Sequence, residues 1–107
     1  MILITYTIML PAGNTIQSLI ETAPELANKM RVQGNYANSL DQCEQLVEYD
    51  PIDNKFITIY RWVDQQAIDN FIEWVNSNVG DYNTTMSEFT ALINSIGGSL
   101  VRTTETI

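Results

Sequence analysis

Apolar residues alternate with more polar ones along residues 2–10, with a period of two. One face of this segment is wholly apolar: Ile2, Ile4, Tyr6, Ile8 and Leu10. The other face mixes threonines with Leu3 and Met9. Alternation of this kind is typical of a β-strand. Because neither face is fully polar, we expect a central strand whose second face is at least partly covered.

The period changes to that of a helix after a Pro-Ala-Gly break. Asn14 and Gln17 fit the two positions of a capping box, in which side chains satisfy the free backbone groups at a helix start. Apolar positions then recur at helical spacing: Ile16, Leu19, Ile20, Ala23, Ala27 and Met30. Pro24 lies inside this pattern, so it either kinks one helix or begins a second. The Gly34-Asn35 pair is predicted to end the helix.

Two extended segments joined by a turn come next. Residues 38–49 are rich in Gln and Glu and predict an exposed strand, whereas residues 55–63 are apolar or aromatic on both faces. Residues 50–54 have the composition of a turn. We therefore predict a hairpin whose second strand lies in the middle of a sheet.

Two helices and a strand are predicted in the remainder of the chain. Asp64 is placed to cap a helix whose apolar residues have helical spacing: Ile68, Phe71, Ile72 and Val75. Thr85 and Glu88 form a capping box for a further short helix. Its buried face is predicted to be Met86, Phe89, Leu92, Ile93 and Ile96. Gly97-Gly98 is expected to end it, and residues 100–107 form the last strand.

The predicted order of elements, β-α-β-β-α-α-β, is that of a ferredoxin-like α+β fold, βαββ(αα)β, with a four-stranded antiparallel sheet. A chain of 107 residues suits one domain, so we expect a single domain over residues 1–107. Right-handed crossovers place the first and third strands side by side in the centre. These two strands have the most two-sided hydrophobicity, so pattern and topology agree.

In such a fold, one face of the sheet has no helix to cover it. Its exposed positions include either Leu3, Met9, Ile57 and Ile59 or the opposite set. An apolar surface of this size usually marks a contact with a partner. We therefore predict a homodimer that buries sheet face against sheet face.

The chain is acidic, with 5 basic and 13 acidic residues and a net charge of −8. Nucleic acids and anionic membranes are bound through clustered Lys and Arg. The basic residues here are scattered: Lys29, Arg31, Lys55, Arg61 and Arg102. We therefore expect neither partner. No apolar run approaches the ~20 residues of a membrane span, and no signal peptide is evident, so a soluble cytoplasmic protein is expected.

The chain contains no histidine and one cysteine, Cys43. It lacks the usual general base and the commonest transition-metal ligand, and neither a metal nor a cofactor is predicted. Cys43 cannot form an internal disulfide. Asp41, Glu44 and Glu48 lie near it in the sequence and would raise its pKa, so an unreactive thiol is expected.

Four residues on two strands are candidates for a ligand pocket. Trp62 ends its strand and either belongs to the core or forms the wall of a pocket for a flat molecule. Tyr60 shares its face, and Tyr6 on the neighbouring strand could stack or hydrogen-bond in the same pocket. Arg61 lies in an apolar strand, so its charge must be paired or reach solvent. We expect it to pair with Glu48 or across a dimer interface, or to bind a ligand carboxylate.

The third strand and the helix after it resemble those of the dimeric α+β barrel superfamily, in particular its antibiotic-biosynthesis monooxygenase-like group. The segment from Phe56 to Trp74 carries an aromatic-x-Trp strand end, an acidic cap at Asp64 and a helix with matching apolar spacing. The resemblance implies a pocket between helices and sheet that accepts flat aromatic or quinone-like molecules. It also implies cofactor-free oxygenation of an activated aromatic substrate.

The heme-degrading relatives in this superfamily use an Asn on the first strand, the Trp at the strand end and a His after the second helix. Only the Trp has a counterpart here, Trp62. The first-strand position falls at Tyr6 or Thr7, and the chain has no histidine. The resemblance therefore does not extend to heme degradation.

Three classes of function are compatible with these patterns. The first is a small enzyme of the monooxygenase-like group. The second is a non-catalytic dimer that binds a small apolar or aromatic ligand or a protein partner, and the third is a structural accessory protein. The enzyme class requires an enclosed pocket lined by Trp62 with at least one polar group beside it, and a solid core there would exclude it. A ligand or partner should raise the melting temperature of a binding protein, whereas a structural protein should show no such shift.

Overall fold

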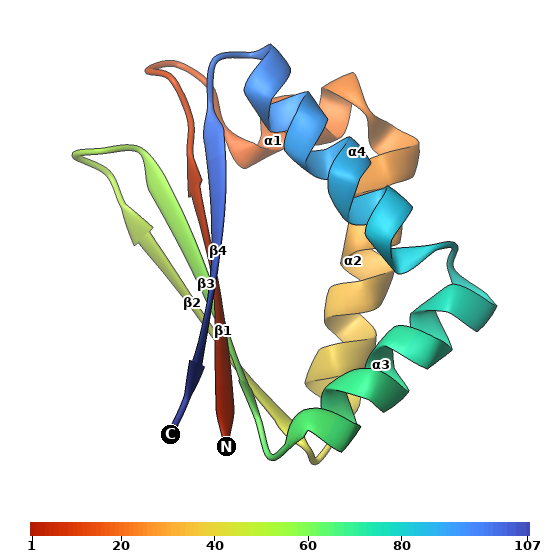
Figure 1. Cartoon of the computed structure of the whole chain (residues 1–107). Helices are drawn as coiled ribbons and strands as arrows, with labels where there is room; N and C mark the ends of the chain where they lie inside the picture. The colour runs from red at the N-terminus through yellow and green to blue at the C-terminus, as the bar shows by residue number, and fades with distance from the viewer.

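A four-stranded antiparallel sheet with all helices on one of its faces makes up the fold, in a computed structural model that describes residues 1–107 (Figure 1). The elements are β1 (Ile2–Met9), α1 (Ile16–Thr22), α2 (Pro24–Ser39), β2 (Cys43–Asp50), β3 (Lys55–Trp62), α3 (Gln65–Asn78), α4 (Tyr82–Ser95) and β4 (Ser99–Thr106). The strand order is β2-β3-β1-β4. The predicted ferredoxin-like α+β fold is confirmed, and β1 and β3 occupy its centre as expected.

The side chains of the sheet fall into two sets because they alternate along each strand. The helix-facing set of the two central strands consists of the pairs Ile2–Trp62, Ile4–Tyr60, Tyr6–Thr58 and Ile8–Phe56. We call the opposite side the outer face. Its apolar members are Leu3, Met9, Leu46, Ile57, Ile59 and Val101. No helix covers the outer face, so the structure selects one of the two sets that the sequence left open.

Pro24 separates two helices rather than kinking one. α1 ends at Thr22, Ala23 lies between the helices, and Pro24 occupies the first turn of α2. Proline is favoured there because the missing N–H has no partner within the helix anyway. The capping box at the start of α1 is formed by Thr15 and Ser18, so the predicted box at Asn14 and Gln17 is wrong by one residue.

α2 continues through Gly34-Asn35 to Ser39, so the predicted helix end at this pair is wrong. A glycine inside a helix costs only about 1 kcal/mol relative to alanine. Gln33 and Ala37, four residues apart, are both buried under the sheet side of α2, and their burial extends the helix by another turn. As a consequence β2 starts at Cys43, later than the predicted start near residue 38.

The predicted N-terminal cap of α3 is confirmed, whereas that of α4 is wrong. The Asp64 side chain accepts a hydrogen bond from the backbone N–H of Ala67 at 2.9 Å, as predicted. α4 begins one turn earlier than the Thr85 box suggested, because Asp81 accepts from the N–H of Thr84 at 2.8 Å. Thr85 is instead buried inside α4, with 2% of its surface exposed.

The C-terminal end of α4 is closed by two glycines, as expected. Gly97 has a φ of +84°, and the N–H groups of Gly97 and Gly98 donate to the carbonyls of Asn94 and Ile93. This pattern is a Schellman motif. A Cβ on Gly98 would lie 2.7 Å from the carbonyl oxygen of Met9, so only glycine lets the chain pass so close to β1.

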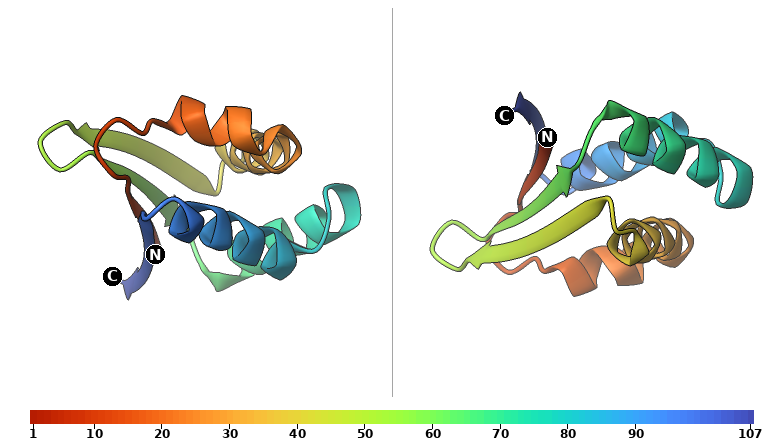
Figure 2. Two further views of the ribbon diagram at one scale, coloured as in Figure 1. Left: turned by 90° about the horizontal axis from the view of Figure 1, so that it is seen from above. Right: turned by 90° about the horizontal axis from the view of Figure 1, so that it is seen from below.

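Two helix pairs lie side by side over the sheet (Figure 2). α2 packs against β2 and α4 against β4. The apolar core is correspondingly divided into two clusters, one around Trp62, Phe71 and Val75 and the other around Leu10 and Ile93. The space between the clusters contains the site described next. No helix of the chain has both the length and the apolar character needed to cross a membrane.

Candidate functional site

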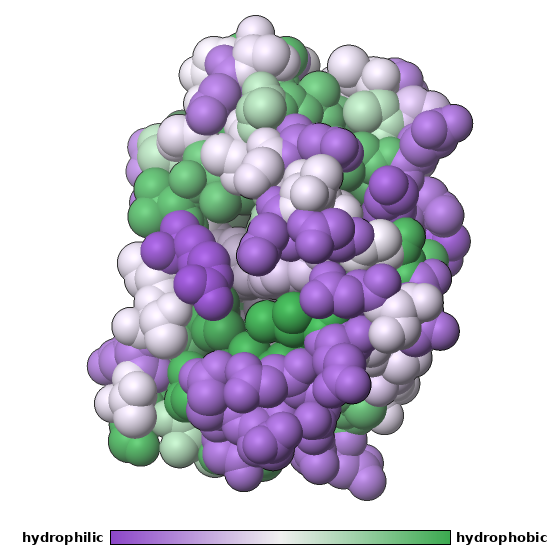
Figure 3. All heavy atoms as spheres, turned by 45° about the vertical axis from the view of Figure 1, so that its right-hand side comes forward, coloured by the Kyte–Doolittle hydropathy of each residue, from purple (hydrophilic) through white to green (hydrophobic).

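A cavity of about 220 Å³ lies between the sheet and the helix layer. The helix-facing side chains of β1, β3 and β4 form one wall, and residues of α2, α3 and α4 form the other. On the helix side of the molecule the surface has a hollow with hydrophobic side chains at its bottom and hydrophilic ones around it (Figure 3). We call this space the sheet–helix cavity.

One end of the cavity is aromatic. Trp62 is 3% exposed, and the Trp62 and Phe71 rings lie 5.2 Å apart between centroids at an angle of 45°. The Tyr6 and Tyr60 rings meet edge to face at 5.7 Å. Flat aromatic walls such as these favour a flat ligand, because offset and edge-to-face ring contacts add to the gain from apolar burial.

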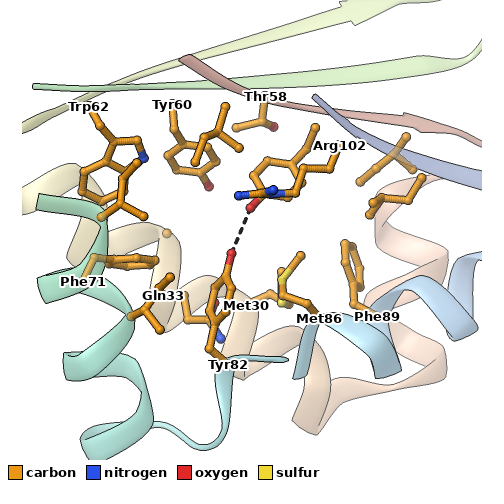
Figure 4. A pocket seen from close by; sticks show the side chains of 17 residues that line it. Met30, Gln33, Thr58, Tyr60, Trp62, Phe71, Tyr82, Met86, Phe89 and Arg102 are labelled. Atoms are coloured by element: carbon orange, nitrogen blue, oxygen red, sulfur yellow. Dashed lines mark hydrogen bonds between the residues drawn. The ribbon is translucent and has the colours of Figure 1, made fainter. Parts of the chain in front are cut away.

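Hydrogen-bonding groups lie next to this aromatic end, in the middle of the cavity between Trp62 and Phe89 (Figure 4). The hydroxyls of Tyr6 and Tyr82 are 3.0 Å apart, in the hydrogen bond drawn as a dashed line. Arg102 on β4 is the direct cross-strand partner of Tyr6, and both residues line the cavity. The hydroxyl of Tyr60 accepts a hydrogen bond from Nε2 of Gln45 at 3.2 Å and keeps its own O–H to donate.

Two tyrosine hydroxyls of the cavity, those of Tyr60 and Tyr82, are held in their protonated form. Burial raises the pKa of Tyr60 to about 12, with a smaller contribution from Tyr6. Burial also raises the pKa of Tyr82 above its usual range, and the nearby charge of Arg102 offsets this only in part. A neutral phenol can donate a hydrogen bond to a ligand oxygen but is a poor proton acceptor. These groups therefore suit binding better than base catalysis.

Gln33 on α2 is the one buried side chain with an unsatisfied polar atom. The residue is 4% exposed and lines the cavity, and its Nε2 has no hydrogen-bond partner. Leaving a buried polar group unpaired costs about 1–3 kcal/mol, and such groups in native proteins call for an explanation. A ligand oxygen that reached this amide would supply the missing acceptor.

The four sequence-predicted pocket residues are divided by the sheet. Trp62, Tyr6 and Tyr60 line the cavity, whereas Arg61 lies on the outer face and does not. The guanidinium of Arg61 is 3.8 Å from the carboxylate of Glu44, its cross-strand partner. The predicted pairing with Glu48 is therefore wrong, because the register places Glu48 opposite Ile57.

Arg102, Tyr82 and Gln33 were not foreseen as site residues. The alternation along β4 puts Leu100 and Arg102 on one face. Pairing this face with the apolar face of β1 would have placed Arg102 on the same side of the sheet as Tyr6. No local pattern marks Tyr82 or Gln33. Each becomes a site residue only through the packing of its helix against the sheet.

Cys43 is buried and free, and it does not line the cavity. Burial raises the pKa of its thiol to about 11, and the neighbouring Glu44 adds to the shift. The thiol is therefore protonated at neutral pH. No three His, Cys, Asp or Glu side chains come together in a group that could hold a metal ion.

A second hollow adjoins the first. It is an apolar groove of about 270 Å³ between α1, α2 and α4. Met30 and Phe89 line both the groove and the sheet–helix cavity. These two side chains therefore form the partition between the two spaces.

No family model matches the sequence, and no curated protein shows significant similarity to it. Known structures do resemble the fold. Rv0793 from Mycobacterium tuberculosis matches with a TM-score of 0.58 and 9% identity, over 100% of this chain and 95% of that protein. A candidate antibiotic biosynthesis monooxygenase from Deinococcus radiodurans matches with a TM-score of 0.53 and 13% identity, over 100% of this chain and 92% of its own.

The fold is also shared by a protein that was not made by evolution. The de novo designed protein Foldit4 matches with a TM-score of 0.53 and 13% identity, over 99% of this chain and 97% of its own length. At identities this low the similarities show the fold alone. They confirm the resemblance in fold to the monooxygenase-like proteins, and the designed protein illustrates that the fold by itself carries no activity.

Proposed function

We propose that this protein binds a small, flat aromatic molecule of the quinone or phenol type in the sheet–helix cavity. The observation that carries the proposal is the buried, unpartnered amide of Gln33 in the wall of an aromatic cavity. A cavity that served only as imperfect packing would have no need of a polar group that lacks a partner. A ligand with an oxygen at its edge explains both features together.

The dimensions and chemistry of the cavity define the ligand further. A space of about 220 Å³ is smaller than the ~300–1,000 Å³ of typical ligand pockets, so one or two fused rings are favoured over a larger molecule. Trp62 and Phe71 would contact the ring faces. The hydroxyl of Tyr6 or of Tyr82 would donate to an oxygen of the ligand.

Oxygenation of the bound molecule is a second candidate function, supported by the fold likeness to the candidate monooxygenase. No Asp or Glu lines the cavity, and the phenols there are poor proton acceptors. A substrate would therefore have to reach the site already activated or ionise readily on binding. Binding is placed first because the geometry of the site supports it directly, and consumption of O₂ in the presence of a hydroquinone would be the sign of turnover.

The binding proposal can be tested with 1,4-naphthoquinone and 2-naphthol as probes, using thermal unfolding and isothermal titration calorimetry. Either probe is expected to raise the melting temperature, as any binder of the native state does. Gln33→Leu should weaken binding about tenfold, because one hydrogen bond to the ligand is lost. The same variant should stabilise the ligand-free protein by about 1–3 kcal/mol, because the unpaired amide is removed.

The matched control is Gln66→Leu, which makes the same change at an exposed position on α3. It should alter neither affinity nor the response to the probes. Binding of both probes at full strength to Gln33→Leu would contradict the proposal, and so would the absence of any shift in melting temperature for the unmodified protein.

We also propose that two copies associate through the outer face. Leu46 and Val101 are each 53% exposed there, and Leu3, Ile57 and Ile59 lie between them without any covering element. Apolar patches on a sheet of this size are rarely left in water. A second copy presents the same residues, so these apolar side chains can meet their counterparts about a two-fold axis.

A further inference from the structure

The charge that lines the sheet–helix cavity is opposite in sign to the net charge of the chain. The sequence has 13 acidic and 5 basic residues, yet none of the acidic residues lines the cavity. Arg102 is the one charged residue that does. The net charge of the chain is −8, so Arg102 opposes the overall field of the protein at this place.

Arg102 has no carboxylate partner within the protein. The only ion pair in the structure is that between Arg61 and Glu44 on the other side of the sheet. Arg102 is an exposed residue of β4 that also lines the cavity. Figure 4 shows its side chain near the Tyr6 end of the Tyr6–Tyr82 hydrogen bond. Its donors are therefore available to a group that enters the cavity.

A second donor is available at the same place. The hydroxyls of Tyr6 and Tyr82 share one hydrogen bond. Whichever of the two donates, the other keeps its own O–H for a further acceptor. An N–H of Arg102 and one phenol O–H can thus converge on one ligand oxygen, while the aromatic end of the cavity at Trp62 holds the ring.

We propose that the cavity selects aromatic anions, whose carboxylate or phenolate oxygen is bound by Arg102 and the Tyr6–Tyr82 pair. This inference rests on the proposed binding function and adds the charge of the ligand to it. Hydrogen bonds to charged groups are stronger than neutral ones. A neutral aromatic of the same shape would leave the cation in a partly desolvated position without a counter-charge.

The experiment compares three probes of one shape by calorimetry at low salt. These are 2-naphthoate, its neutral amide 2-naphthamide, and 2-naphthol titrated through its own ionisation. The unmodified protein is expected to bind naphthoate, or naphthol once it is ionised, at least tenfold more tightly than naphthamide. Preference for naphthoate alone identifies a carboxylate as the ligand group, and preference for ionised naphthol alone identifies a phenolate. Added salt should weaken the binding of the anion and leave the affinity for naphthamide unchanged.

Arg102→Gln should abolish the preference for the anion while naphthamide still binds. Lys29→Gln is the matched control, since it removes the same charge from a residue of α2 that lines neither hollow. This control should keep the preference within about twofold. Because Arg102 is exposed on β4, its replacement should leave the unfolding transition cooperative, which far-UV circular dichroism verifies.

Failure of this inference differs from failure of the proposed function. If naphthamide binds as tightly as both anions and Arg102→Gln changes nothing, the selection of anions is overturned and binding of aromatics stands. If none of the probes binds, the proposed function itself is overturned.

Discussion

On its helix-facing side the sheet carries Ile4, Tyr60 and Trp62 beneath four helices, whereas on the outer face no helix covers Leu3, Ile57 and Ile59. Both sides are incomplete, but in different ways. The helix-facing side encloses a small space with polar groups next to aromatic ones, and the outer face is broad, with apolar residues beside the exposed Arg61–Glu44 pair. The first shape suits a small molecule, and the second suits another flat apolar surface.

Trp62→Ala should have the largest effect, since it removes the most buried aromatic residue of the helix-facing side. Truncation of a buried aromatic side chain typically costs about 3–5 kcal/mol. We expect a loss of this size in the free energy of unfolding measured with urea. Trp74→Ala is the matched control, because that ring is half-buried and stacks on Tyr36 at 3.7 Å between centroids. An equal loss for both variants would show that Trp62 has no special place in the core.

Ile59→Asp tests the outer face in the same manner. A carboxylate buried without a partner in a contact between two copies is strongly unfavourable, so the variant should dissociate at least a hundredfold more readily than the unmodified dimer. Analytical ultracentrifugation at micromolar concentration should then detect a monomer of 12.1 kDa.

Val47→Asp is the control for the outer face, because Val47 is 67% exposed on the helix-facing side of β2. It should leave the dimer intact. A monomeric unmodified protein, or equal dissociation of both variants, would contradict the proposed association through the outer face.

Alkaline pH should lower the stability of the folded protein through Cys43, which lies on the helix-facing side of β2. Burial raises the pKa of its thiol from 9.0 to about 11. Between these values the unfolded chain has lost a proton that the folded chain retains, so stability falls as the pH rises. The melting temperature should be flat below pH 9 and decline above it. Cys43→Ala should reduce that decline, and an identical pH profile for the variant would contradict the assignment.

The smallest effect is expected from Tyr6→Phe, which removes the hydrogen bond to Tyr82 at 3.0 Å. The loss in stability should be about 0.5–1.5 kcal/mol. Thr5→Val changes the adjacent residue, whose side chain lies on the outer face, and should have no measurable cost in urea unfolding. A larger loss for Thr5→Val would reverse the roles that the structure gives to the two faces.

The fold was predictable because period-two and period-3.6 patterns are local. The alternation along residues 2–10 predicted β1 and its two faces without deciding which face meets the helices, and the hydrophobicity of residues 55–63 placed β3 in the centre. Helix ends were less predictable, since several residues near each end can cap. Asp81 caps α4 although Thr85 and Glu88 also fit a capping box.

The candidate site was only partly predictable. Arg61 is next to Trp62 in the sequence, but adjacent residues of a strand point to opposite faces, and this rule alone argues against a shared pocket. Arg102 lies opposite Tyr6 only once the register between β1 and β4 is known. The unsatisfied amide of Gln33 depends on what surrounds it in three dimensions, and no sequence pattern records that.

The partition formed by Met30 and Phe89 sets the length of the sheet–helix cavity, and that length can be changed by substitution. The two residues lie on separate helices, α2 and α4, and both have long side chains that can be shortened. Methionine adapts its shape to irregular spaces with little strain. Shortening both side chains would join the groove to the cavity, and an extended hydrocarbon chain attached to the ring would then have a place to lie.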